Sequence, residues 1–116
     1  MIEQDFWQHI KSNVPLVDGR VYANVIEQEA PKPAIVYMVQ KEIVRGSCSS
    51  DNRYREWLLH IYAKEYLEAK EIKEQVVIAL KSFAVNVQNI EVSDAFEEEA
   101  ELFVQVIKFN TGKETL

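Results

Sequence analysis

Apolar residues between Tyr66 and Phe83 recur at steps of three and four positions. This spacing places them on one side of a helix, as a stripe made of Ala69, Ile72, Val76, Ala79, Leu80 and Phe83. Lysines and glutamates lie largely outside the stripe, where oppositely charged pairs four residues apart support a helix. The pattern predicts an amphipathic helix over 66–83 that needs an apolar partner surface.

The remaining chain contains a short helical pattern and several strand-like runs. Apolar residues at helical spacing predict a first helix over 2–12, which the proline at position 15 ends. Strands are predicted over 20–26, 34–44, 54–63, 87–92 and 102–109. Within 54–63 the alternation is clear, and we expect one of its faces to lie under the long helix: Trp57, Leu59, Ile61 and Ala63.

The order of these elements predicts one domain over 1–116 of the α+β class. Strands joined by short loops favour antiparallel pairing. We therefore expect an antiparallel twisted sheet of four to five strands, with a short N-terminal helix and one long helix packed on one face.

Two of the predicted strands, over 34–44 and 102–109, are apolar on both faces at least in part. Two helices, one of them short, do not cover both sides of such a sheet. We expect the leftover apolar face to contact a second copy or another chain, with Tyr37, Tyr54, Tyr62 and Phe103 as its members. The alternative is a sheet that curls over its own core.

The net charge of −6 comes from one segment of the chain. Six acids lie between positions 91 and 101 with no base among them: Glu91, Asp94, Glu97, Glu98, Glu99 and Glu101. The other 13 acids balance the 13 bases. Such a chain lacks the clustered lysine and arginine of a nucleic-acid grip. The opening residues resemble no signal peptide and no run is long enough for a membrane span, so we expect no membrane partner.

Catalytic and metal-binding patterns are weak. The two histidines are isolated, three glycines do not build a phosphate loop, and Cys48 has no local histidine to activate it. His60 shares a strand face with Glu56 and Tyr62, so the three side chains could form a hydrogen-bonded cluster. With no second ligand or nucleophile nearby, the simpler interpretation is a partly exposed histidine on a strand. The acidic segment lacks the glycine and spacing of a calcium loop. We expect no enzyme, no cofactor and no metal.

Three parts of the chain resemble the tail terminator proteins of long-tailed bacteriophages, also called tail completion or head-to-tail joining proteins. They are the short opening helix, the segment VYANVIEQEAPKPAIVYM and the segment REWLLHIYAKEYLEAKEIKEQVVIAL. The second is similar to the family's strand, acidic-Ala-Pro loop and Pro-led strand, and the third to its strand that runs into an amphipathic helix. The likeness covers most of the chain between Val21 and Phe109 and is one of pattern more than identity.

This resemblance implies a structural protein that forms a ring, commonly a hexamer, which caps the tail tube and joins it to the head. Its partners would be the tail tube protein and the head connector proteins, and its location the host cytoplasm during assembly and then the virion tail. The uncovered sheet face would be a subunit interface. The acids Glu97, Glu98, Glu99 and Glu101 would line the lumen, where DNA passes without specific binding.

A different class of function remains open from the residues alone. A small homodimeric cytoplasmic module would pair through the same sheet face and bind a ligand or a protein near His60, Tyr62 and Trp57. Mass measurement discriminates between the two, because a ring grows beyond a dimer and the module does not.

Overall fold

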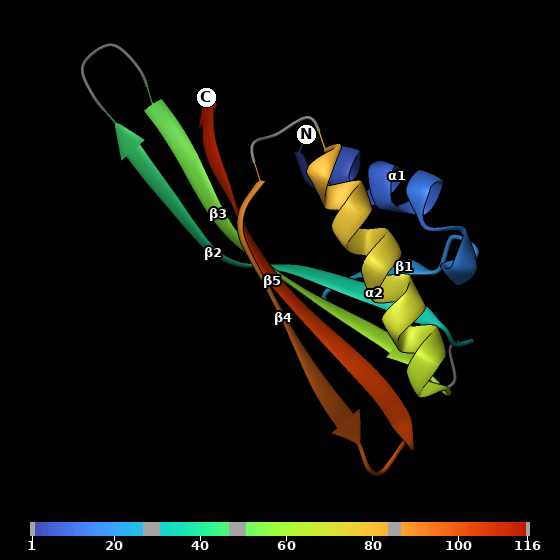
Figure 1. Ribbon diagram of the computed structural model, residues 1–116. Helices are drawn as coiled ribbons and strands as arrows, with labels where there is room; N and C mark the ends of the chain where they lie inside the picture. Colours follow the sequence, from blue (N-terminus) through green and yellow to red (C-terminus); the bar gives the residue numbers. More distant parts are fainter. Residues whose placement is uncertain (1, 27–30, 47–50, 84–86, 116) are drawn as a thin grey trace.

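The computed structural model describes residues 2–26, 31–46, 51–83 and 87–115, with positions 45, 51, 52 and 113–115 described by their backbone alone. Five strands form one sheet in the order β1-β2-β3-β5-β4. The strands are β1 (Val21–Ala23), β2 (Ala34–Gly46), β3 (Asp51–Ala63), β4 (Val87–Glu97) and β5 (Leu102–Thr115). The helices α1 (Ile2–Asn13) and α2 (Tyr66–Lys81) lie on the same side of this sheet, as Figure 1 shows. A 3₁₀ turn over Pro15–Val17 links α1 to β1.

This architecture confirms the predicted α+β fold with both helices on one face. The sheet is mixed, however, because β1 runs parallel to β2 while the other three pairings are antiparallel. Strand β2 begins beside the start of β1, so that Val21 lies opposite Ile35 and Ala23 opposite Tyr37. Expecting antiparallel pairing for β1 was wrong, because the two strands run in the same direction.

The core lies between the two helices and the sheet. Phe6 and Ile10 of α1 and the predicted stripe of α2 are buried against β2, β3 and β5. Trp57 and Phe109, which are opposite each other on β3 and β5, stack with ring centroids 5.6 Å apart. The indole N–H of Trp57 donates a 2.9 Å hydrogen bond to Thr111, which satisfies this buried polar group. The face predicted to lie under the long helix is therefore the buried one.

The sheet extends well beyond the helices. The described chain measures 51 × 25 × 22 Å, and the ends of β2, β3 and β5 project past both helices at the upper left of Figure 1. We call this projection the distal arm and define it as residues 41–46, 51–55 and 111–115. Within it Glu42 forms ion pairs with Arg53 at 2.9 Å and Arg55 at 3.4 Å. The arm gives the domain a long strand surface that the helices do not cover.

Candidate assembly surface

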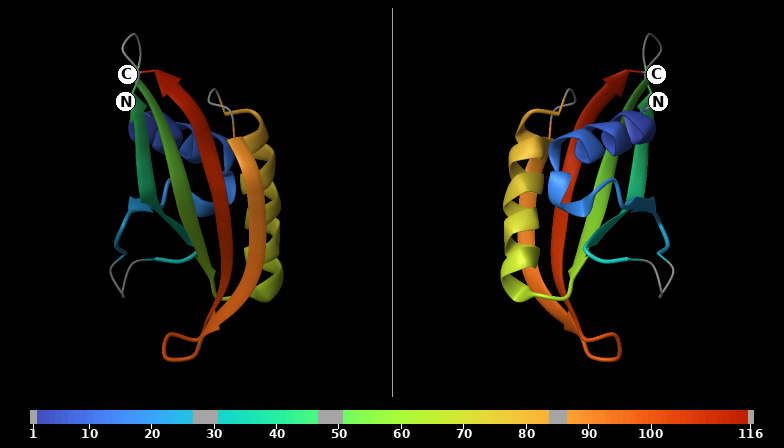
Figure 2. Two further views of the ribbon diagram at one scale, coloured as in Figure 1. Left: turned by 90° about the vertical axis from the view of Figure 1, so that its left-hand side faces the viewer. Right: turned by 90° about the vertical axis from the view of Figure 1, so that its right-hand side faces the viewer.

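The strand register divides the sheet into a helix-covered face and an open face. Leu59 lies opposite Ile107 on the covered face, whereas Leu58 lies between Met38 and Lys108 on the other. In the left view of Figure 2 the sheet stands in front of the helices, and no described helix lies over the surface that faces the viewer. We call this surface the open face. Its apolar members on β2, β3 and β5 are Val36, Met38, Leu58, Tyr62, Val104 and Val106.

Several of these side chains keep contact with solvent. Met38, Leu58, Tyr62 and Val106 are half-buried, although the last three lie on β3 and β5, the inner strands of the sheet. A sheet face of this kind is stable in a globular protein when another layer packs on it. A contiguous apolar surface without such a layer is typical of a site for another chain.

Two of the four tyrosine and phenylalanine residues expected on the open face are there. Tyr62 lies opposite Ala34 and Val104, and Tyr54 lies opposite Ile43. Both lie on the same face of β3 as Leu58, because side chains alternate along a strand. The sequence analysis named only aromatic residues for this face, and it therefore missed the aliphatic side chains of Met38, Leu58 and Val106.

The placement of Tyr37 and Phe103 on the open face was wrong. Tyr37 lies opposite Leu59 on the covered face, is 6% exposed and packs edge-on against Phe6 with ring centroids 5.4 Å apart. Phe103 lies opposite Ala63 and contacts Tyr66 of α2 at 5.7 Å. The error has a physical reason: both strands are apolar on both faces, so their alternation does not say which face the helices cover.

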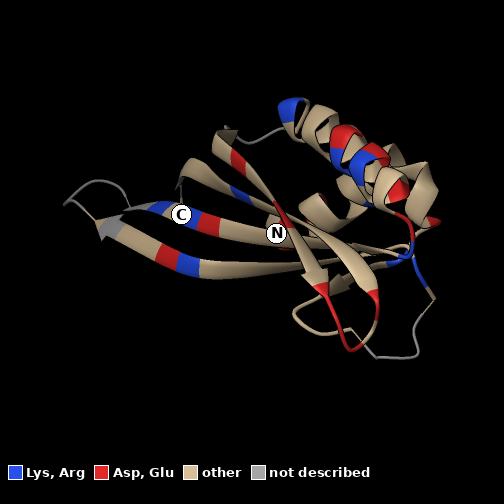
Figure 3. Cartoon of the chain, turned by 60° about the horizontal axis from the view of Figure 1, so that its bottom comes forward, with Lys and Arg blue, Asp and Glu red and all other residues tan. Residues whose placement is uncertain are grey.

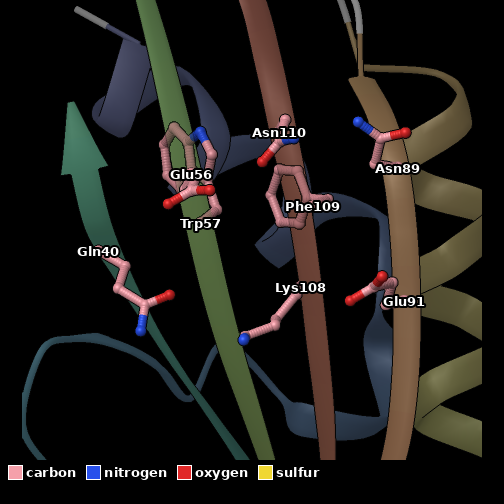
Figure 4. A pocket seen from close by; sticks show the side chains of 8 residues that line it. All are labelled: Gln40, Glu56, Trp57, Asn89, Glu91, Lys108, Phe109 and Asn110. Atoms are coloured by element: carbon pink, nitrogen blue, oxygen red, sulfur yellow. The ribbon is translucent and has the colours of Figure 1, made fainter. Parts of the chain in front are cut away.

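A polar pocket of about 290 Å³ interrupts the open face between its apolar part and the distal arm. Figure 4 shows it from the open side, with Gln40, Glu56, Glu91, Lys108 and Asn110 reaching toward the same space. Glu91 of β4 lies opposite Lys108 of β5, so charges of both signs are present. Among the described residues no three histidine, cysteine or acidic side chains group as a metal site. The pocket therefore presents a mixed-charge, hydrogen-bonding surface.

His60 and Tyr62 form the other polar feature of the open face. The Nδ1 atom of His60 lies 3.1 Å from the Tyr62 hydroxyl. Burial lowers the pKa of His60, an effect that nearby Glu97 partly opposes. Burial and the same carboxylate raise the pKa of Tyr62. Trp57 points to the opposite face of β3, so the expected pocket shared by His60, Tyr62 and Trp57 does not form.

The acidic segment separates into two groups. Glu97, Glu98, Glu99 and Glu101 are exposed at the turn between β4 and β5, and their part of the ribbon is red in Figure 3. Asp94 instead lies on the helix side of β4, opposite Gln105. It accepts hydrogen bonds from Lys70 at 2.9 Å and Gln105 at 2.7 Å. These hydrogen bonds lower the pKa of Asp94, and the bond from Lys70 has the largest effect.

The remaining side chains weighed for chemistry have structural positions or lie outside the described residues. The Nε2 atom of His9 lies 2.7 Å from the carbonyl oxygen of Ala79 and so donates to it, which links α1 to the end of α2. Cys48 lies outside the described residues. Within the described chain, no helix is both long and apolar enough to cross a membrane.

Comparisons with known proteins support the fold. Neither a protein-family model nor a curated protein matches the chain. Among solved structures, the chain is similar to one from the "Virion of native gene transfer agent (GTA) particle". The two are 15% identical, superpose with a TM-score of 0.64, and match over 93% of this chain and 90% of the other. The chain therefore shares the fold of a virion component along nearly its whole length.

Proposed function

We propose that this protein is a structural component of a phage-like virion, and specifically a tail terminator. In this role copies form a ring that caps the tail tube and joins it to the head. The observation that carries the proposal is the open face: a sheet surface with half-buried Met38, Leu58 and Val106 over which no described helix lies. Such a surface fits a protein whose stable form is part of a larger assembly.

The likeness to a chain of a gene transfer agent particle supports the coarser part of the proposal. That match covers nearly all of both chains, so it concerns the whole domain and not a shared motif. The tail terminator role itself rests on the sequence resemblance described above. The same likeness supports a role without catalysis, since the other chain belongs to a virion particle.

We assign Tyr54 and Tyr62 to an interface within the assembled particle, since both share the open face with Leu58. We assign the turn acids to the lumen. Glu97, Glu98, Glu99 and Glu101 lie at one end of the sheet, away from the distal arm, and all are exposed. Repeated around a ring, they would repel the DNA backbone and let it pass without binding.

The competing function, a homodimeric ligand-binding module, loses its predicted pocket because Trp57 and His60 lie on opposite faces. It keeps the possibility of pairing through the open face. Mass photometry and negative-stain electron microscopy of the purified chain discriminate between the two. Ring-shaped particles of more than two copies, formed alone or with added tail tube protein, support the terminator. A dimer that never grows and never associates with tubes overturns it.

A further inference from the structure

The sheet ends in two unpaired edges on opposite sides of the domain. On one side β4 pairs, among the residues that the structure describes, only with β5, and all of its residues except Val87 and Ile90 are exposed. On the other side β1 pairs with β2 only over Ile35–Tyr37. Within the described chain, β2 therefore has no outer neighbour from Met38 to Gly46. Each edge presents a row of backbone N–H and C=O groups that can pair with another strand.

The directions of the two edges match. Strand β4 is antiparallel to β5, β5 is antiparallel to β3, and β3 is antiparallel to β2. Three reversals make β4 antiparallel to β2. If a second copy stands beside the first with its sheet continuing in the same sense, β4 of one copy meets β2 of the next as an antiparallel pair. This is the pairing that sheets form most readily.

The side chains along the two edges also match. On the open face β4 carries Glu91 and Glu97, and β2 carries the exposed Lys41, which lies opposite Glu56. On the helix side β4 exposes Val92 by 41% and Phe96 by 50%, and β2 exposes Val44 by 54%. Joining the edges would place opposite charges on one side and apolar groups on the other.

Pairing between two β4 edges is disfavoured by the same residues. It would bring Glu91, Asp94 and Glu97 of one copy next to the same acids of the other. Like charges on an edge strand are a known device against self-pairing. The contact between copies would therefore be head-to-tail, and such contacts produce closed rings or filaments rather than isolated dimers.

From these features, and resting on the ring assembly proposed above, we propose that copies of this chain join edge to edge, with β4 of one copy paired antiparallel to β2 residues 38–46 of the next. The open face then forms a continuous surface on one side of the ring. It is left free for a different chain of the particle, such as the tail tube.

Disulfide trapping tests this pairing directly, because opposite residues of antiparallel strands have Cα separations that suit a disulfide. In a Cys48→Ser background, one protein carries Lys41→Cys and a second carries a cysteine at Glu91, Ser93, Ala95 or Glu97. Each is oxidised alone and in mixture. In the control, the β4 cysteine is replaced by Leu67→Cys. Leu67 lies on α2 and is 77% exposed.

We expect no covalent dimer from any single variant, a covalent dimer from Lys41→Cys mixed with one of the β4 variants, and none with Leu67→Cys. A chain that carries both edge cysteines should give a ladder of covalent oligomers. A dimer from a β4 variant alone would overturn the proposal. If mass measurement shows oligomers but no β4–β2 crosslink forms, the edge pairing is overturned and the ring assembly of the proposed function is not. A monomer without crosslinks, even with tail tube protein, would overturn both.

Discussion

Lys70 of α2 donates a 2.9 Å hydrogen bond to Asp94 of β4 and thereby ties the long helix to the outermost strand of the sheet. Tyr66 and Gln105 donate to the same carboxylate at 3.2 and 2.7 Å. One acid of a segment that looks like a solvated charge run thus links β4, which pairs with β5 along its length, to α2 as well. Because β4 carries one of the two free edges, this contact also positions the surface through which we propose that copies join.

Replacing Asp94 by Asn should lower the melting temperature of the isolated chain. The charged acceptor of three hydrogen bonds becomes a neutral amide, while the shape is kept. Thermal unfolding followed by circular dichroism measures the effect. Glu98→Gln is the matched control, since Glu98 is exposed at the turn, and it should leave the melting temperature unchanged.

The same contact predicts a pH dependence. The pKa of Asp94 is lowered in the folded chain, so its stabilising effect is present above the pKa of an unfolded aspartate and is lost as pH falls through the folded value. The difference in melting temperature between the native chain and Asp94→Asn should shrink as pH falls across this range. A difference that stays constant down to the lowest pH would contradict the assignment.

His60 should make the fold weaker in mild acid. Burial lowers its pKa, so the folded state binds a proton less readily than the unfolded state. Stability should be greatest above the pKa of an unfolded histidine, about 6.5, and should decline as pH falls from there toward the lower folded value. His60→Gln should flatten this part of the profile in urea unfolding curves. An unchanged slope would show that another group titrates.

Tyr37 and Tyr62 should behave in opposite ways, because they lie on opposite faces of the sheet. Tyr37→Ala removes a buried ring that contacts Phe6 and should cost about 3 kcal/mol of unfolding free energy. Tyr62→Ala removes a half-buried ring of the open face and should cost much less stability while weakening association with the tail tube protein. Urea unfolding, and sedimentation with added tail tube protein, provide the comparison for both variants. Equal losses of stability would contradict the two-face assignment.

The turn acids should matter for function and not for folding. Glu97, Glu98 and Glu99 are exposed, so changing all three to alanine should leave the circular dichroism spectrum and melting temperature unaltered. If they line a DNA passage, assembly or DNA delivery should suffer in a parent phage that carries the variant. Undiminished infectivity would rule out the lumen role.

The sequence predicted those parts of the fold in which apolar residues lie on one face of an element only. The alternation in 54–63 assigned Trp57 and Leu59 to the covered face, and the helical stripe assigned Ile72 and Val76 to the core. It could not assign Tyr37, because β2 begins apolar on both faces and only the register with Leu59 decides. It also could not show that β4 continues to Glu97, since Asp94 looks like a loop acid until its contact with Lys70 is known.

The central claim is that the open face is covered by another chain in the assembled protein. Sedimentation velocity over a range of concentrations, comparing the native chain with a Leu58→Asp, Val106→Asp variant, tests it most directly. Leu67→Asp, at an exposed apolar position of α2, is the control. With tail tube protein present, we expect the native chain and the control to sediment together with the tube protein, and the open-face variant to sediment apart from it. Identical distributions for all three proteins would contradict it.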